Sequence, residues 1–95
     1  MEVRIIATLQ AKPEYVDAVS TAVHEIIEAS RLEVGNLQYD LHRDMDKPGC
    51  FVFFERWASS EALEKHNVTE HFQLFVSQVD GKLEQLDIKK LKQIA

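Results

Sequence analysis

The segment Cys50–Trp57 (CFVFFERW) constrains the fold of this chain more than any other, because it is apolar on both faces of an extended strand. The alternation of a strand places Cys50, Val52 and Phe54 on one face, and Phe51, Phe53 and Trp57 on the other. Only Glu55 and Arg56 interrupt this pattern. An antiparallel sheet with helices on one side normally has a polar second face. Burying one such aromatic stabilises a fold by roughly 1.5–3 kcal/mol, so both faces of this sheet are expected to be covered.

A second copy of the chain is the expected cover for the outer face. The chain has 95 residues, which predicts one domain spanning 1–95. A domain of this size buries only about 60–65% of its unfolded surface, so it gains from additional stabilisation. Its one cysteine, Cys50, cannot form an internal disulfide, and no cysteine cluster suggests structural zinc. The sequence therefore predicts a homodimer in which two sheets pack together.

The first half of the chain predicts a strand, a helix and a hairpin. Val3–Leu9 alternates as a strand, and the Pro13 region then begins an amphipathic helix of about five turns that ends near Gly35. Leu37–His42 alternates again, and after a turn it pairs with Cys50–Trp57.

The second half predicts a broken helical region and a final strand. Ser59 or Ser60 caps a short helix, and Thr69 caps a second helix that ends at Gly81. Leu83–Leu91 can form the last strand. The order β-α-β-β-α-β predicts an α+β, ferredoxin-like fold with a four-stranded antiparallel sheet.

Charge and hydropathy argue against two classes of partner. The net charge of -5 disfavours binding to a nucleic acid backbone, and the basic run 89–92 is interpreted as a solvated end. No apolar run approaches the roughly 20 residues that span a membrane. The first residues do not resemble a signal peptide, so we expect a cytoplasmic protein.

His66 and His71 are the strongest candidates for proton transfer, because they flank the break between the two short helices. Their spacing alone is weak and favours capping or surface roles. The pair could converge with Glu55 on a metal, but no recognised ligand spacing is present and no metal is expected.

Glu55 and several aromatic residues are further candidates. A carboxylate in an apolar strand needs a partner or a raised pKa, and pairing of Glu55 with Arg31, Arg56 or a lysine is favoured over catalysis. Core packing is the simplest role for the aromatic side chains, although a slot lined by them would also suit a planar aromatic ligand. These side chains are Tyr39, Phe54, Trp57 and Phe72.

Four segments in combination resemble the antibiotic biosynthesis monooxygenase family. Residues 30–41 (SRLEVGNLQYDL) resemble its SR-x-E-x-G-x-x-x-YDL signature, and residues 51–57 resemble its F-x-x-x-E-x-W strand. Ala62-Leu63, His66 and His71-Phe72 match its AL-x-x-H … HF segment, and Lys12-Pro13 matches the start of its first helix. The resemblance covers nearly the whole chain in the right order.

The resemblance implies a dimeric α+β barrel with a pocket between sheet and helices. It also implies a monooxygenase that uses no flavin, haem or metal, acting on a small quinol or phenol. Carried onto this chain, His66 and His71 would handle protons. Asn67 or Tyr39 would orient a small aromatic or quinone-like substrate, with Phe54, Trp57 and Phe72 as walls.

Departures from the family pattern leave two alternatives open. Thr69-Glu70 replaces a common Ser-Pro, and Val3–Leu9 lacks the asparagine of the haem-degrading branch, so haem is not expected. The 34–37 stretch resembles an isomerase relative, which suggests an isomerase or tautomerase of a small dicarbonyl. If that substrate is phosphorylated, one of three arginines must face the pocket: Arg31, Arg43 or Arg56. The third hypothesis is a dimer that binds a small molecule without catalysis.

Overall fold

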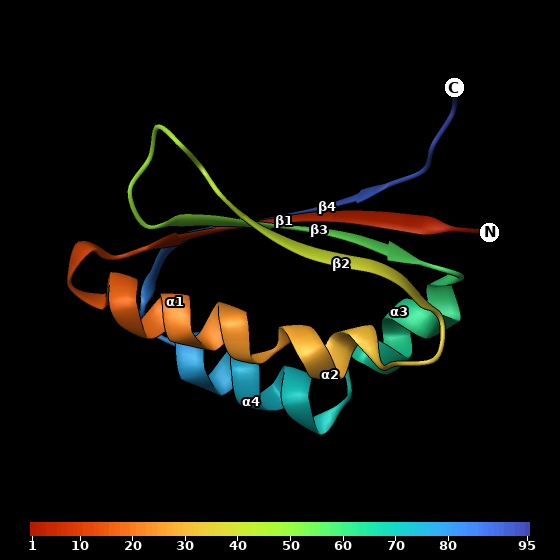
Figure 1. Cartoon of the computed structure of the whole chain (residues 1–95), viewed down its shortest axis with the longest axis horizontal. Helices are drawn as coiled ribbons and strands as arrows, with labels where there is room; N and C mark the ends of the chain where they lie inside the picture. Colours follow the sequence, from red (N-terminus) through yellow and green to blue (C-terminus); the bar gives the residue numbers. More distant parts are fainter.

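A four-stranded antiparallel sheet forms one layer of the fold, and the helices lie against one of its faces (Figure 1). The computed structural model describes all residues 1–95. The strands are β1 (Val3–Ala11), β2 (Asn36–Arg43), β3 (Cys50–Trp57) and β4 (Leu83–Leu91), in the spatial order β2-β3-β1-β4. The predicted ferredoxin-like order is confirmed, and β3 and β4 have the predicted bounds.

The predicted first helix is interrupted. A short 3₁₀ turn, η1 (Pro13–Tyr15), precedes α1 (Val16–Glu25), and α2 (Ile27–Arg31) follows after a break at Ile26. The break in the second helical region is confirmed, with α3 at Ser60–His66 and α4 at Glu70–Val79.

Side-chain caps fix where α3 and α4 begin. The Ser59 hydroxyl accepts a hydrogen bond from the Ala62 N–H, and the Thr69 hydroxyl accepts one from the Phe72 N–H. Each cap satisfies a backbone donor that the first helical turn leaves unpaired. Thr69 also donates to the His66 carbonyl at 2.8 Å, so one side chain ties the end of α3 to the start of α4.

The core lies between the inner face of the sheet and the helices. Alternate residues of β1 are buried, and β3 buries Phe51, Phe53, Glu55 and Trp57. Val19 and Val23 of α1 are fully buried in the same core. Because successive side chains of a strand face opposite sides, only every second residue of β3 can reach a site beneath the helices. Phe54 points to the other side of the sheet, away from the helices.

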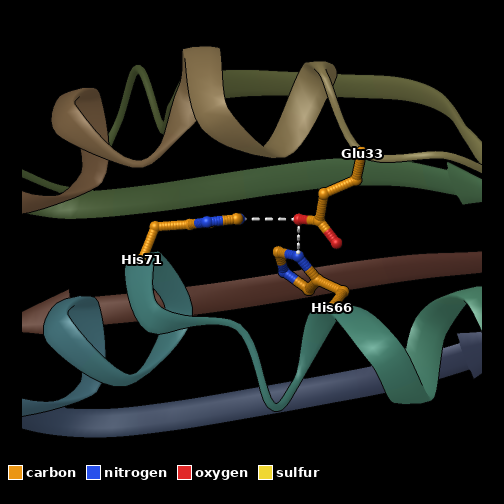
Figure 2. A group of neighbouring side chains, drawn as sticks. All are labelled: Glu33, His66 and His71. Carbon is orange, nitrogen blue, oxygen red and sulfur yellow. Dashed lines mark hydrogen bonds and ion pairs between the residues drawn. The ribbon is translucent and has the colours of Figure 1, made fainter.

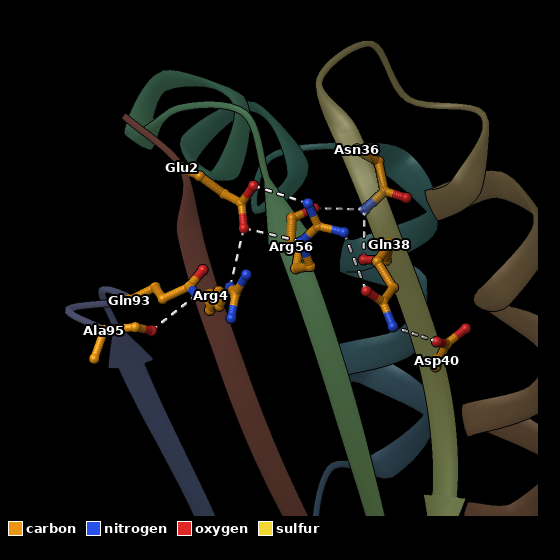
Figure 3. Close-up of polar contacts among 8 residues, drawn as sticks. All are labelled: Glu2, Arg4, Asn36, Gln38, Asp40, Arg56, Gln93 and Ala95. Atoms are coloured by element: carbon orange, nitrogen blue, oxygen red, sulfur yellow. Dashed lines mark hydrogen bonds and ion pairs between the residues drawn. The ribbon is translucent and has the colours of Figure 1, made fainter.

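The outer face of the sheet has an apolar centre and a polar margin. Ile6 of β1 pairs across the ladder with Phe54, and both are partly exposed, as is Val52. Arg56 on this face does not contact Glu55; it forms an ion pair with Glu2, which Arg4 also contacts (Figure 3). Hydrogen bonds from Arg56 and Arg4 lower the pKa of Glu2 to about 2.

Candidate active site

A cavity of about 490 Å³ lies between the inner face of the sheet and the helices α3 and α4. Most of the side chains that line it are hydrophobic, among them Phe72 and Phe75. Its polar lining includes Tyr39, Glu55, His66, Asn67 and Lys90. A mostly apolar cavity with a few polar groups is the usual form of a small-molecule site, and this size is in the common range.

His66, the last residue of α3, is buried in the wall of this cavity. Its side chain is only 2% exposed. Its ring centroid lies 4.6 Å from that of Trp57, 5.0 Å from Phe72 and 5.6 Å from Tyr39. The capping or surface role that spacing alone favours is therefore wrong for His66. The imidazole lies at the break after α3 and points inward. In this buried environment each of its hydrogen bonds is stronger than it would be in water.

Glu33 joins His66 and His71 into one hydrogen-bonded cluster (Figure 2). A single carboxylate oxygen, Oε2, lies 2.6 Å from His66 Nδ1 and 2.7 Å from His71 Nε2. The Glu33 side chain is 12% exposed and that of His71 is 26% exposed. Sequence reasoning included Glu33 in a family motif but gave it no role, because it lies 33 residues from His66.

A close approach of two backbones brings Glu33 to His66. Gly35, two residues after Glu33, has φ of 91° and lies against α3. A Cβ atom there would come within 2.6 Å of the Ala62 Cβ, so only glycine allows this contact. The Ala58 N–H donates to the Gly35 carbonyl at 2.8 Å and holds the turn in place. The glycine in the motif thus positions the glutamate.

The hydrogen bond to Glu33 sets the proton arrangement of His66. Burial lowers the pKa of the imidazole, and the Glu33 carboxylate opposes this effect. The ring is therefore neutral at neutral pH and carries one proton. An ionised carboxylate only accepts hydrogen bonds, so that proton sits on Nδ1. Nε2 is then the unprotonated nitrogen of a ring that lines the cavity, as a general base requires.

The same three side chains offer a donor set that transition metals accept: two imidazoles and a carboxylate. Their ligand atoms, however, are separated by 2.6 and 2.7 Å at Glu33 Oε2. Ligand atoms that share a metal with bonds of about 2.0–2.1 Å lie about 2.9–3.4 Å apart. The cluster therefore has hydrogen-bond geometry, and a metal could enter only if the ligands spread. Glu55 is the third ligand considered from the sequence beside the two histidines, but in the structure Glu33 takes that position.

Glu55 has no cationic partner, so the favoured pairing with an arginine or lysine is wrong. Its Oε1 accepts a hydrogen bond from the Trp57 indole at 2.9 Å, and its side chain faces the cavity. Arg31 instead contacts Asp40 and the Tyr39 carbonyl. Burial raises the pKa of Glu55 to about 7, an effect that the Trp57 N–H reduces and the charge of Glu33 increases.

Tyr39 also faces the cavity, and its proton is held firmly. Burial raises the pKa of the phenol, and the neighbouring charge of Glu55 adds to that effect. The hydroxyl is thus a hydrogen-bond donor rather than a base at neutral pH.

The aromatic walls differ from the sequence-based assignment at two positions. Tyr39, Phe72 and Asn67 line the cavity. Phe54 does not, because neighbouring residues of a strand face opposite sides and Glu55 takes the inner one. Trp57 faces inward but is fully buried behind His66 and does not reach the cavity. The cavity instead uses Phe53, one residue earlier than Phe54.

Comparison with known proteins decides the family. Residues 2–78 match the family model described as antibiotic biosynthesis monooxygenase. The chain belongs to the antibiotic biosynthesis monooxygenase family. The match includes every residue of the Glu33 cluster and most of the cavity wall, so the site lies inside the family domain.

Individual known proteins are similar to most of this chain. YcnE of Bacillus subtilis, provisionally named a monooxygenase, is 37% identical over 71 residues, which cover 75% of each chain. Rv0793 of Mycobacterium tuberculosis, with a similar provisional name, is 32% identical over 77 residues, covering 81% of this chain and 75% of Rv0793. The crystal structure of PA3566 from Pseudomonas aeruginosa superposes with a TM-score of 0.94 at 35% identity, covering 99% and 95% of the two chains.

These likenesses support monooxygenase-type chemistry for the family domain and establish its α+β fold. None of the helices combines the length and the apolar character needed to cross a membrane.

Proposed function

We propose that this family member is a cofactor-independent monooxygenase that oxidises a small quinol or phenol with O₂. The observation that supports this most strongly is the placement of His66: a buried imidazole in the wall of a mostly apolar cavity, with its Nδ1 2.6 Å from the Glu33 carboxylate. Such a group can take a proton from an aromatic hydroxyl without any cofactor.

The chemistry requires little from the protein beyond a base and a dry cavity. His66 Nε2 removes an O–H proton from the quinol, and the electron-rich anion passes one electron to O₂. The two radicals combine to form a C–O bond, and the peroxide then loses water as the ring carbon gives up its hydrogen. The balance is quinol plus O₂ to hydroxyquinone plus H₂O, so the substrate itself supplies all the electrons.

Other cavity residues have supporting roles in this proposal. Tyr39 and Asn67 lie where they can hydrogen-bond to substrate oxygens, and Phe72 offers a flat apolar wall. Glu55, with a pKa of about 7, is partly protonated near neutral pH and can donate a hydrogen bond to a developing oxyanion. Exclusion of water by the apolar lining protects the radical pair from side reactions.

Oxygen uptake with menadiol tests the proposal. We expect His66→Gln to lower kcat by about 10²- to 10⁴-fold, the usual contribution of a general base. His24→Gln is the matched control, since His24 is exposed on α1 and should change turnover little. Uptake by the wild type that persists unchanged in His66→Gln would contradict the assignment of the base. No uptake with any quinol would contradict the monooxygenase itself.

An isomerase or tautomerase is the second candidate, because His66 and Glu55 place a base and a partly protonated carboxyl on one cavity. Such a pair suits enolisation of a dicarbonyl. Arg31, Arg43 and Arg56 do not line the cavity, so a phosphorylated substrate would have to rely on Lys90, the one lysine or arginine that does. Solvent deuterium entering a candidate dicarbonyl, followed by NMR, would support the isomerase; lack of protein-dependent exchange would oppose it.

A homodimer is part of the proposal, with the outer faces of two sheets packed together. The apolar centre formed by Ile6, Val52 and Phe54 has no helix over it, because the helices lie on the other face (Figure 1). Sedimentation of the wild type at micromolar concentration should give a dimer, and Phe54→Glu should give a monomer. Val34→Glu, at a 96% exposed residue of the α2–β2 turn, is the control. A stable wild-type monomer would contradict this assembly.

We further propose that residues 1–95 act as one domain in the cytoplasm. The buried free thiol of Cys50 is compatible with a reducing compartment.

A further inference from the structure

We infer that Glu33 is the positioning residue of the candidate base His66, and that His71 acts by holding Glu33 rather than by reacting with substrate. The inference deepens the proposed function and rests on it for its kinetic part. Its basis is the shared oxygen of Glu33, which lies 2.6 Å from one imidazole and 2.7 Å from the other (Figure 2).

Glu33 fits this role because it contacts the nitrogen of His66 that the reaction does not use. Its hydrogen bond to Nδ1 fixes the tautomer and the direction of the ring, so Nε2 remains free to accept a proton. Once Nε2 is protonated, the imidazolium carries a positive charge in a buried place. A carboxylate in direct contact stabilises that charge, as the acidic member of a catalytic triad does.

His71 occupies a different position from His66. It is not part of the cavity lining, and its side chain is partly exposed. Its Nε2 bonds to Glu33, and its other ring nitrogen makes no hydrogen bond within the chain. A side chain that does not line the cavity is poorly placed to take a proton from a substrate bound there. In this proposal His71 holds the carboxylate in place, in contrast to the catalytic role expected from the sequence.

No neighbouring group can replace Glu33. Glu33 on the α2–β2 turn, Tyr39 on β2 and His71 on α4 lie next to His66. Glu55 on β3 lines the same cavity. Only Glu33 makes a hydrogen bond to the His66 ring. Glu55 accepts a hydrogen bond from the Trp57 indole and makes none to His66, and the Tyr39 phenol stays protonated because burial raises its pKa.

The tautomer of His66 tests the inference without any turnover. With ¹⁵N-labelled histidine, NMR at neutral pH should show the Nδ1–H form of His66 in the wild-type protein. Glu33→Gln should shift the ring toward a mixture of tautomers, because the neutral amide can accept or donate. Finding His66 in the Nε2–H form in the wild type, or in an unchanged form in Glu33→Gln, would overturn the inference.

Kinetics with menadiol then separates positioning from catalysis. We expect Glu33→Gln to lower kcat by about 10²-fold with KM nearly unchanged, since the carboxylate acts only through His66. His71→Gln keeps a donor for Glu33 and should retain at least about a third of kcat, whereas His71→Phe should lose about tenfold. If His71→Gln is as inactive as His66→Gln, His71 is itself catalytic and the inference fails.

The two readouts distinguish the possible failures. A wild-type protein with the Nδ1–H tautomer but no oxygen uptake would contradict the proposed monooxygenase while supporting the positioning role of Glu33. An active wild type whose kcat does not respond to Glu33→Gln would contradict the positioning role alone.

Discussion

Two carboxylates, Glu33 and Glu55, lie at the same core but in different surroundings. Glu33 lies on the turn between α2 and β2 and bonds to two imidazoles. Glu55 lies within β3 and receives only the indole N–H of Trp57. The first is therefore placed to fix a neighbouring base. The second is left without a cationic partner, and burial raises its pKa to about 7.

The difference between them comes from how each residue is positioned. Glu55 faces inward because strand alternation places it on the same side as Phe53 and Trp57. Glu33 reaches His66 because Gly35 lets the turn approach α3 closely. One carboxylate thus depends on the register of a strand, and the other depends on a tertiary contact. Three substitutions test this difference between a strand position and a tertiary contact.

The largest effect is expected at Gly35, because Glu33 depends on it. Gly35→Ala should lower the free energy of unfolding by about 3 kcal/mol, through both the positive φ and the contact with Ala62. Thermal or urea unfolding measures this loss. Gly81→Ala is the matched control, since Gly81 also has positive φ but has no atom within 4 Å of its added Cβ, and it should cost only about 1 kcal/mol. Equal losses at both glycines would show that the close approach does not matter.

A smaller and pH-dependent effect is expected at Glu55. Its folded-state pKa of about 7 lies above its ordinary value of 4.5, so the protonated carboxyl favours the folded state. The stability that it contributes is complete below about pH 4.5 and is lost as the pH rises through 7. Glu55→Gln removes this loss while keeping an acceptor for Trp57. The free energy of unfolding of Glu55→Gln, relative to that of the wild type, should rise by about 2 kcal/mol between pH 5 and pH 8.

Urea unfolding at the two pH values measures this difference. If the stability difference between Glu55→Gln and the wild type does not depend on pH, the pKa of Glu55 is not raised by folding. The proposed difference between Glu55 and Glu33 would then be wrong.

The smallest effect is expected at Thr69, which joins α3 to α4. Thr69→Ala should lower the free energy of unfolding by about 1 kcal/mol, because it removes the cap of α4 and the hydrogen bond to the His66 carbonyl. Thr69→Ser should restore most of it. Ser59→Ala removes the cap of α3 at a similar cost, but it should leave the NMR signals of the His66 ring unchanged. If both alanine variants shift those signals equally, Thr69 has no special role in placing the two histidines.

Much of the fold could be predicted from local patterns. A continuous apolar run located β3, spaced apolar residues located β4, and the caps at Ser59 or Ser60 and at Thr69 located α3 and α4. These features depend on neighbouring residues, so a short window of sequence contains the physics that produces them. The wrong placement of Phe54 comes from a rule that the same window already contains, since Phe54 and Glu55 cannot face one side of a strand.

Local sequence patterns were enough to predict the order of the strands, the starts of α3 and α4, and the two histidines at the break between them. The burial of His66, the lack of a cationic partner for Glu55 and the bonds of Glu33 to both imidazoles became visible only in the folded structure. These outcomes depend on atoms far apart along the chain that meet only when a turn, a strand and two helices pack together. A short window cannot contain that contact, because its energy comes from burial and hydrogen bonding in the assembled core.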